Sequence, residues 1–525
     1  MRYIRTLHTN TSRISEHPTM KPASAPLNTT ASRWRRTTGG LALAGLLALL
    51  LADMEIARSS PGQELLRMGK GFLAPDFFAT EQLGKALANT LAFAWQGTAL
   101  AALFGFFMAI CWSSRAVRGF AASIRAIHEL FWGLLLLQVA GLSTLTGVLA
   151  IAIPYAGIFA KVFGEFLEEA DPAPSHALPA STTTISRFFF ARLPLVWQAF
   201  KAYGSYRLEC ALRASAILGF IGLPTLGFHL ETAFREGVYD QGAALLYLFF
   251  ALIFTLRWWL RPGLIPLYLI AAVAWAPPLF TGNLDTLVRF ITVDLVPAPL
   301  RQSGGLLELS QWFAMLWQQQ LWPGLWQTVV LGLAALLLTG ILALLLFPLT
   351  SPLFGNRASR SLGQGILVVL RTTPEFFLAF FFLILLGPSM LPGILALALH
   401  TGAIVAHLTG RFSETLRLRA DAPTGINRYA YEVLPRISPN LLAFLLYRWE
   451  VIMRETAVLG ILGIHTLGFY IDSSVAEFRF DRTALLILAT VLLNLGVDTL
   501  SRTLRRRLRL QPGHGVSASN APARR

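Results

Sequence analysis

Apolar runs long enough to cross a lipid bilayer constrain this chain more than any other feature. A transmembrane helix needs roughly 20 consecutive, mostly apolar residues. The composition agrees, because 54% of the 525 residues are hydrophobic and 14% are charged, against about 25% charged residues in ordinary soluble domains. The sequence predicts an all-α integral membrane protein with about twelve spans, at residues 39–56, 87–112, 127–140, 144–164, 207–228, 242–260, 263–280, 324–347, 373–387, 391–410, 448–469 and 483–500.

Two of the predicted regions, 127–164 and 373–410, are ambiguous because their apolar runs are short. Each is compatible with two tightly turned helices or with one span and a re-entrant piece.

Basic residues set the expected orientation. With both termini in the cytoplasm, the cytoplasmic segments hold about 34 Lys and Arg residues and the outer segments about 9. The net charge of +16 is then explained by loops that face anionic lipid headgroups, and nucleic-acid binding is not needed. The basic segments 32–36 and 502–510 are expected to anchor the chain at the inner surface.

The first apolar run follows a basic segment and has two interpretations. It is either a cleaved secretory signal or an uncleaved signal anchor, and the weak cleavage site favours the anchor. Residues 1–38 and 511–525 are expected to be disordered cytoplasmic tails, because they are rich in polar and basic residues.

One segment occurs twice. Residues 206–231 and 447–472 share 12 identical positions of 26, read directly from the printed sequence, where unrelated sequences would share about one or two. The duplication predicts a first repeat at 39–262 and a second at 263–510. Each repeat holds six predicted spans, an even number, so the copies should lie parallel around an axis along the membrane normal. The repeated segment should line the seam between them.

Each copy of this segment carries three charges that would cost ~2.5–3.5 kcal/mol apiece against lipid. The spacing of four residues predicts that Glu209 pairs with Arg213, and Glu450 with Arg454, on one helical face. A second motif, R-x-x-x-E, predicts helix charge pairs at Arg125 with Glu129 and at Arg371 with Glu375. The pairs either tie helices together or act directly on a solute. The predicted translocation path contains Arg207, Glu209, Arg213, Gly219, Gly222 and Gly227, with Arg448, Glu450, Arg454, Gly460, Gly463 and Gly468.

The glycines in this path are expected to permit close packing and hinge motion. Pro224 should kink or break the first copy, where His465 takes the matching place in the second. His465 is interpreted as a packed or water-facing residue rather than a metal ligand.

Several chemical functions are not indicated. Cys111 and Cys210 are far apart in sequence, so no disulfide framework or metal-binding cysteine pair is predicted. The chain contains no G-x-x-x-x-G-K-[ST] sequence, so it carries no ATPase of its own. We expect no catalytic residues, no metal site and no resident cofactor.

Taken in order, "LLRMGKGFLAPDFF", "NTLAFAWQGT", "FGEFLEEADPAP" and the repeated "YRLE" and "YRWE" segments resemble a known family. The chain is similar to phosphonate- and phosphate-type permease subunits of bacterial ABC importers over roughly residues 60–260 and 320–510. It resembles two such subunits fused head to tail, which implies the MetI-like fold of type I importers. The resemblance implies uptake of phosphonate, phosphite, phosphate or a similar oxyanion across the bacterial inner membrane.

The same resemblance implies two partners. A periplasmic solute-binding protein would deliver the solute, and two ATP-binding cassette subunits would dock on cytoplasmic coupling loops and consume ATP. The residues that match the coupling motif are Glu168, Glu169, Ala170, Leu193 and Pro194 in the first repeat, and Glu414, Ala422, Leu434 and Pro435 in the second. Both loops depart from the family pattern at its glycine position.

Two alternatives remain open from the residues alone. The aromatic and basic loop segments 185–204 and 426–444 would also suit amphipathic helices that lie on the membrane surface. An ion-coupled secondary transporter built from parallel repeats would likewise place broken helices at a repeat seam.

Overall fold

The computed structural model describes residues 27–58, 60–179, 181–277, 284–302 and 305–508. Within these ranges every regular element is a helix, which confirms the predicted all-α class. Six helices are long and apolar enough to cross a membrane, or ten if each of four bent pairs is one span. Ten of the twelve predicted spans coincide with these, and the predictions at 39–56 and 263–280 do not.

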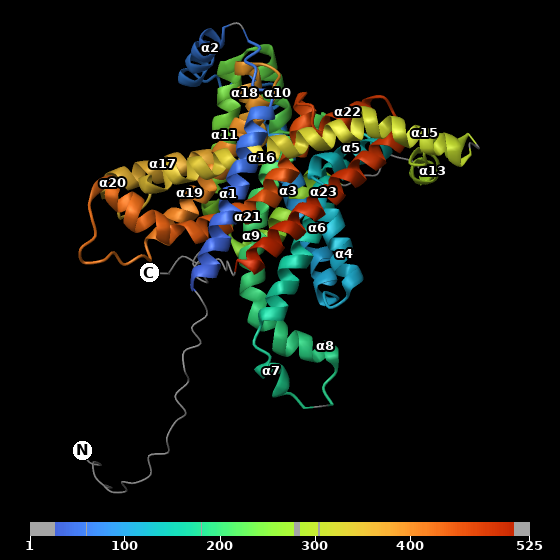
Figure 1. The fold of residues 1–525 in the computed structure, drawn as a ribbon. Coiled ribbons are helices and arrows are strands. Elements are labelled where there is room, and N and C mark those ends of the chain that lie inside the picture. Colours follow the sequence, from blue (N-terminus) through green and yellow to red (C-terminus); the bar gives the residue numbers. More distant parts are fainter. Residues whose placement is uncertain (1–26, 59, 180, 278–283, 303–304, 509–525) are drawn as a thin grey trace.

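The two repeats form two bundles of corresponding helices (Figure 1). The first bundle consists of α3 (Leu83–Ile110), α4 (Arg115–Ala126), α5 (Glu129–Ala140), α6 (Thr144–Glu169), α9 (Leu193–Ile217), α10 (Leu226–Glu236) and α11 (Tyr239–Trp259). The second consists of α16 (Trp322–Leu346), α17 (Arg357–Thr372), α18 (Glu375–Leu386), α19 (Met390–Ser413), α21 (Leu434–Val458), α22 (Leu467–Ala476) and α23 (Phe480–Arg507).

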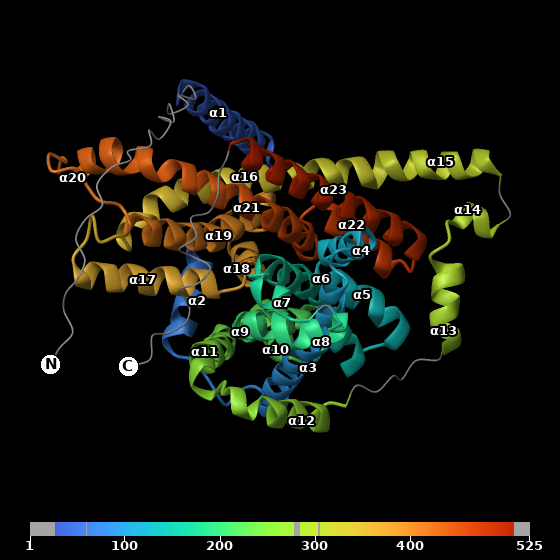
Figure 2. The same cartoon turned by 90° about the horizontal axis from the view of Figure 1, so that it is seen from below.

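The two bundles run in different directions. Figure 1 shows α7 (Ala173–His176) and α8 (Thr184–Arg187) at the bottom and α20 (Gly425–Asn427) at the left, with α10 and α22 towards the top and right. The long helices of the first bundle are seen end-on in Figure 2, whereas those of the second cross the view. The long helices of the two bundles are therefore strongly tilted against each other.

The ambiguous short runs prove to be bent pairs. α4 and α5 meet at 87°, and α17 and α18 at 88°. In the first pair, Ile127 and His128 are extended and the His128 ring accepts a hydrogen bond from the backbone of Leu130, which caps α5. In the second, Pro374 forces the residue before it out of helical geometry. Different residues thus produce the same bend.

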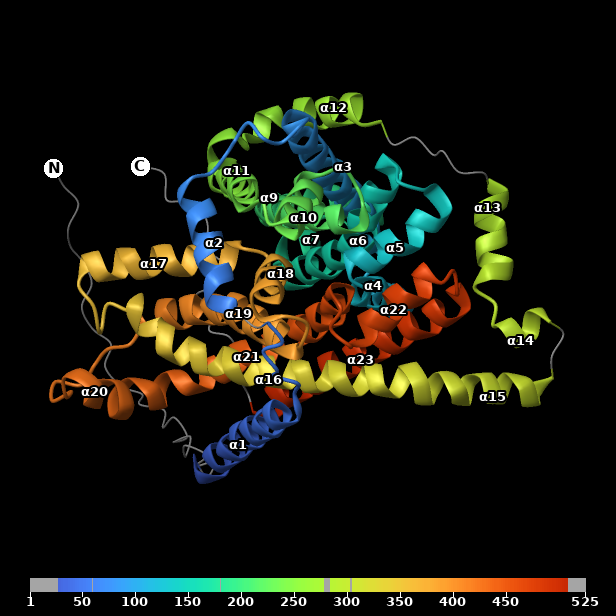
Figure 3. The same cartoon turned by 90° about the horizontal axis from the view of Figure 1, so that it is seen from above.

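Each of the two predicted spans without a counterpart packs on the bundle of the other repeat. α1 (Leu27–Leu51) packs on α16 of the second bundle, where a Cβ on Gly45 would lie 2.7 Å from Cβ of Leu337. α12 (Ile265–Trp275), only 11 residues long, packs on α3 of the first bundle, and Figure 3 shows both at the outside of the molecule. Gln96 donates to the carbonyls of Ala272 and Ala276, both at 2.8 Å.

The tail predictions are only partly testable. α1 begins at Leu27, so the predicted disordered tail is helical from that residue on, which corrects the limit at residue 38. Residues 1–26 and 511–525 lie outside the described ranges.

Three π-helical turns each end just before a proline near the start of a long α-helix. They cover 188–192, 317–321 and 428–433, and they precede Pro194, Pro323 and Pro435. Proline cannot donate to the carbonyl four residues earlier and its ring clashes there, so a locally widened turn accommodates it. Because of this turn, α15 (Leu306–Leu316) and α16 form one helical segment that runs from Leu306 to Leu349.

Candidate functional site: the seam between the repeats

The repeated segment forms a sharp break in both bundles. Each α9-type helix ends in a 3-10 turn, at 218–221 and 459–462, and the chain then bends by 52° and 44° into α10 and α22. The residue after the turn has a positive φ, 90° at Gly222 and 88° at Gly463. Glycine adopts this backbone conformation without strain. We call residues 218–228 and 459–469 the break segments.

Two further glycines in each break segment allow backbone to touch backbone. A Cβ on Gly227 would lie 1.7 Å from the carbonyl oxygen of Ala216, and one on Gly468 would lie 1.7 Å from that of Ala457. Similarly, a Cβ on Gly219 would lie 2.1 Å from the backbone nitrogen of Phe228, and one on Gly460 would lie 2.0 Å from that of Phe469. No other residue type fits there, which explains the repeated glycine spacing.

A threonine from a neighbouring helix completes each break. The hydroxyl of Thr90 on α3 accepts a hydrogen bond from the backbone of Leu226 at 3.0 Å, and Thr328 on α16 does the same for Leu467 at 3.0 Å. The residues at the N-caps of α10 and α22, Thr225 and Thr466, make no capping hydrogen bond with their own side chains. The hydroxyls of Thr90 and Thr328 cap these helices instead. Sequence comparison of the two repeated segments missed both threonines because they lie outside them.

The first copy does break at Pro224, as predicted, but the proline is not what the two breaks share. The second copy bends by nearly the same amount with His465 in its place, so the glycine turn and its threonine cap cause the break. The ring of His465 lies edge-on against Phe469, with the centroids 4.4 Å apart, and the residue is exposed, which fits its interpretation as a packed or water-facing residue.

The two predicted i,i+4 ion pairs have different outcomes. Arg213 binds Glu209 at 3.0 Å, as predicted. Glu450 does not pair with Arg454 but with Arg125 of the first repeat at 2.8 Å, and Arg125 also contacts Asp498 at 3.3 Å. The prediction for the second copy fails because α4 packs against α23 and brings a stronger partner across the seam.

The R-x-x-x-E pairs are also wrong. Glu129 and Glu375 lie beyond the bends that end α4 and α17, so neither shares a helical face with its arginine. Each contacts a histidine instead, Glu129 with His128 at 3.5 Å and Glu375 with His400 at 3.3 Å. His128 also lies 3.0 Å from Glu455 of the second repeat, which in turn lies 3.5 Å from Arg454. Neither His128, at the bend before α5, nor His400, which contacts the carbonyl of Thr373 at the bend before α18, gave a signal in the sequence.

Arginine side chains in this seam have unmet donors. The Nε atoms of Arg207, Arg213 and Arg454 are buried and donate to no group in the described part of the chain. Arg207 lies over the ring of Tyr155, 3.8 Å from its centroid. Among the described residues, no carboxylate lies within ion-pair distance of Arg207, Arg371 or Arg448. Buried donors of this kind normally find a partner, so the seam presents unused positive hydrogen-bonding groups.

Aromatic side chains close the seam above these charges. Phe220 of the first break segment packs against Phe376 and Phe380 of α18, with ring centroids 4.6 and 5.3 Å apart. In the opposite direction, Phe131 of α5 lies 3.2 Å from the Cβ position of Gly468 in the second break segment. Each bundle thus packs an aromatic helix on the break of the other. Deeper in, the space between Arg125, Glu450 and Asn494 measures only about 10 Å³, room for roughly one water molecule.

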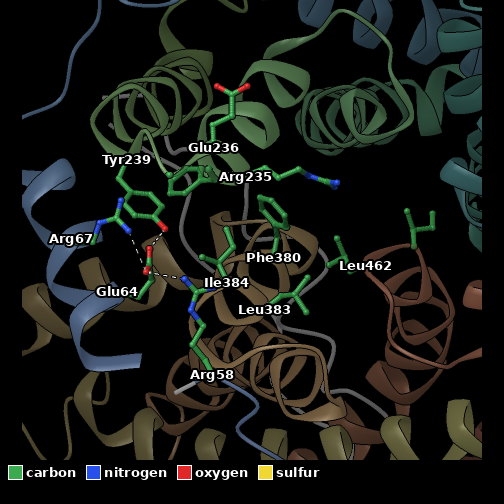
Figure 4. A pocket seen from close by; sticks show the side chains of 13 residues that line it. Arg58, Glu64, Arg67, Arg235, Glu236, Tyr239, Phe380, Leu383, Ile384 and Leu462 are labelled. Atoms are coloured by element: carbon green, nitrogen blue, oxygen red, sulfur yellow. Dashed lines mark hydrogen bonds and ion pairs between the residues drawn. The ribbon is translucent and has the colours of Figure 1, made fainter. Parts of the chain in front are cut away.

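A pocket of about 560 Å³ lies on the other side of this closure (Figure 4). It is bounded by α2 (Pro61–Leu73), α10, the start of α11, α18 and the second break segment. Its apolar lining includes Phe380, Leu383 and Leu462, and its charged lining includes Arg58, Glu64, Arg67 and Arg235. Both repeats line it, as expected of the mouth of a path along their seam.

The first predicted coupling segment projects from the bundle (Figure 1). Glu168 and Glu169 lie exposed in the last turn of α6, Ala170 ends that helix, and Glu168 contacts Arg118 at 3.6 Å. Leu193 and Pro194 begin α9 in one helical stretch that runs from Thr184 to Ile221. They are therefore not at the end of a loop but inside a continuous helix.

The second predicted coupling segment is held more tightly. Glu414 ends α19 and is exposed, while Leu434 and Pro435 begin α21. The buried carboxylate of Glu432, which was not predicted, binds Arg419 at 3.1 Å and Arg436 at 2.8 Å. Ala422 was placed at the glycine position of the coupling motif, but the residue with a positive φ in this segment is Gly425, at 64°.

A metal centre is not found in the described ranges, where no group of three His, Cys, Asp or Glu side chains could hold an ion.

Comparison with known proteins agrees with this architecture. Residues 341–510 match the family described as binding-protein-dependent transport system inner membrane component. The chain is 24% identical over 471 residues to the phosphate-import permease protein PhnE of Mycolicibacterium smegmatis, covering 81% of this chain and 86% of that protein. It is 30% identical over 191 residues to the phosphite transport system permease protein PtxC of Stutzerimonas stutzeri, covering 34% and 70%. It is 31% identical over 120 residues to the putative cryptic phosphonate transport system permease protein PhnE2 of Escherichia coli, covering 22% and 98%.

Together, the helical repeats, their paired break segments and these relatives define a multi-pass permease subunit of an ABC importer, a transport protein and not an enzyme. The chain belongs to the family of binding-protein-dependent transport system inner membrane components. The alternative of an ion-coupled secondary transporter is not supported by this assignment.

Proposed function

We propose that this chain supplies both halves of the membrane path of an importer for phosphate, phosphite, phosphonate or a similar oxyanion. The single observation that carries the cargo class is the set of unmet arginine donors in the seam, Arg207, Arg213 and Arg454. An oxyanion with three or four acceptor atoms would satisfy such donors through charge-assisted hydrogen bonds. The names of the three relatives, which refer to phosphate, phosphite and phosphonate transport, support the same class.

The partners follow from the importer class. We propose that two ATPase subunits bind the segments around Pro194 and Pro435, one for each repeat, and that a periplasmic binding protein delivers solute to the pocket above the seam. In Figure 1 the first segment lies at the bottom of the view and the second at the left, whereas α2, α10 and α18, which line that pocket, lie towards the top. This arrangement requires both termini to lie on the cytoplasmic side of the inner membrane.

Reconstitution tests the proposal. The chain is placed in proteoliposomes with candidate ATPase and binding-protein subunits, and uptake of phosphate, phosphite and methylphosphonate is measured with ATP or with an ion gradient. ATP-dependent uptake of at least one of these anions is expected. Uptake driven by the gradient alone, or ATP-dependent uptake of uncharged solutes only, would contradict it.

The docking segments have their own test. Pro194→Glu combined with Pro435→Glu places carboxylates on exposed positions of both segments. Uptake should be lost while the amount of inserted protein stays unchanged, because these residues lie outside the packed bundles. Unchanged uptake would instead favour helices that only rest on the membrane surface.

A further inference from the structure

A segment before the first bundle crosses the mouth of the seam and is tied to both repeats. We call it the outer strap; it consists of residues 53–58 and α2. On the second repeat, the carbonyl of Asp53 accepts a hydrogen bond from the backbone of Met390 at 3.0 Å, and the backbone of Arg58 donates to the carbonyl of Leu386 at 3.2 Å. Gly387, with φ of 91°, allows Ala57 to approach closely.

On the first repeat, the strap is held by α2. A Cβ on Gly71 would lie 2.6 Å from the backbone of Tyr239, so α2 and the start of α11 are in direct backbone contact. Tyr247 donates to the carbonyl of Phe72 at 2.8 Å. The ring of Phe72 lies between the two repeats, 6.3 Å from Phe234 and 5.9 Å from Phe381.

The carboxylate of Glu64 joins these two attachments. It accepts a hydrogen bond from Arg58 at 2.9 Å and from the hydroxyl of Tyr239, and it lies 3.5 Å from Arg67. Figure 4 shows the three donors converging on it at the edge of the pocket. The Glu64 side chain is 8% exposed, whereas those of Arg58 and Arg67 are 44% and 63% exposed. The charge at the centre is thus covered by its own donors.

This donor set matches an external anion as well as it matches Glu64. Two guanidinium groups and one hydroxyl are the groups that bind phosphate-type oxyanions in proteins. Glu64 offers only two oxygens, while a tetrahedral oxyanion offers three or four. Arg235 faces the same pocket from α10, and its i,i+4 partner Glu231 is not among the pocket residues. The pocket of about 560 Å³ beside the cluster leaves ample room for a small anion.

We propose that Arg58, Arg67 and Tyr239 form an entry site for a phosphorus oxyanion at the outer mouth, and that Glu64 occupies this site as an internal substitute until the solute displaces it. The ligand class rests on the proposed function. The anion then joins Arg58, held on the second repeat, to Tyr239 of the first, and the displaced Glu64 loses its contacts to both. An arriving anion therefore loosens the start of α2, which these contacts hold at the mouth of the seam.

Phosphate binding to the purified chain tests this site without ATPase or binding protein. In Glu64→Gln the internal anion is gone and both arginines are released, so inorganic phosphate should bind at least about tenfold more tightly than to wild type, or ~1.4 kcal/mol. Glu55→Gln is the matched control, because Glu55 lies exposed on the same strap and its carboxylate accepts no hydrogen bond in the described structure. Adding Arg58→Gln and Arg67→Gln to Glu64→Gln should abolish the gain.

A second measurement tests whether phosphate displaces Glu64 in a chain that keeps this carboxylate. It therefore decides the question even if Glu64→Gln does not fold. A spin label is attached at Gly62→Cys, an exposed strap position with open space around its Cβ, in a chain whose Cys111 and Cys210 are replaced by serine. Phosphate at constant ionic strength should increase label mobility, and chloride should not. Equal mobility in both salts would overturn the displacement of Glu64.

These outcomes separate the entry site from the importer function. If the reconstituted importer takes up phosphate but Glu64→Gln binds it no better than Glu55→Gln, the entry site is wrong and the proposed function stands. If Glu64→Gln gains phosphate affinity that the arginine substitutions remove, the entry site is supported whether or not phosphate proves to be transported.

Discussion

The guanidinium of Arg125 lies 2.8 Å from the carboxylate of Glu450, although 325 residues separate them. Their repeat equivalents, Arg371 and Glu209, make no such ion pair, because Glu209 binds Arg213 within its own helix. Of these two equivalent ion pairs across the seam, one is formed and the other is not; we call the Arg125–Glu450 pair the closed bridge. The fused chain can keep this asymmetry because its two halves differ in sequence, which two identical subunits could not do.

The closed bridge should contribute measurably to stability. Glu450→Gln leaves Arg125 largely buried with only Asp498 as a partner, so we expect the free energy of unfolding to fall by ~2–3 kcal/mol, somewhat below the cost of breaking a fully buried pair. Glu168→Gln is the matched control, because its exposed pair with Arg118 should contribute at most about 1 kcal/mol. Thermal unfolding in detergent measures both. Equal effects of the two substitutions would show that the bridge is not stabilising.

The break-segment glycines should tolerate no side chain. In Gly227→Ala or Gly468→Ala the new methyl group meets a carbonyl oxygen at 1.7 Å, so we expect little folded protein in fluorescence-detected size-exclusion chromatography. Gly496→Ala, with nothing within 4 Å of its Cβ, should instead be neutral or stabilising by up to about 1 kcal/mol, because alanine favours the helix. Normal yields of both break-segment variants would disprove the close packing.

The two capping threonines should be equivalent. Thr90→Val and Thr328→Val each keep the shape of the side chain but leave the backbone N–H of Leu226 or Leu467 buried without an acceptor, at a cost of about 1–3 kcal/mol. Thr499→Val, exposed on α23, should change stability far less. Unfolding midpoints of the three variants give the comparison. A large effect of only one capping variant would mean that the two breaks are not stabilised alike.

Arginines in the seam should govern anion transport. We expect Arg213→Ala with Arg454→Ala to lower ATP-dependent phosphate or phosphonate uptake at least about tenfold, because the double variant removes two of the three arginines whose buried Nε atoms have no acceptor. Arg357→Ala, exposed at the start of α17, should leave uptake unchanged. Intact uptake and solute preference in the double variant would assign these arginines to helix packing only.

The Glu64 cluster predicts a defined pH response. The hydrogen bond from Tyr239 and the charges of Arg67 and Arg58 lower the pKa of Glu64 below its ordinary value, against the opposing effect of burial. A lowered pKa in the folded protein means that the stabilisation is present above the ordinary pKa of about 4.3 and is lost as the pH falls through the folded value.

The stability difference between wild type and Glu64→Gln should accordingly stay constant between about pH 6 and 8 and shrink only in stronger acid. The other charged or titratable groups that line the pocket are Arg58, Arg67, Arg235, Glu236 and Tyr239, and Glu236→Gln serves as the control for a second carboxylate there. Thermal unfolding across the pH series measures the difference. A change near neutral pH would assign the response to another group.

Much of the architecture was predictable because it depends on local sequence. Apolar length identified ten of the spans, and the repeated glycines marked where each copy breaks. The pairing of Glu209 with Arg213 was also local, since residues four apart on a helix must be neighbours. The same rule failed for Glu450 because a distant arginine outcompeted the local one.

The sequence by itself determined that the chain is a helical membrane protein with one segment duplicated, because hydrophobic length and glycine spacing act over short stretches. Only the tertiary structure decided that α1 and α12 pack on opposite bundles, that Glu64 joins both repeats at the outer mouth, and which acid each seam arginine binds. These outcomes depend on which helices meet across hundreds of residues, and the energy of a buried charge is set by the partner that packing brings to it.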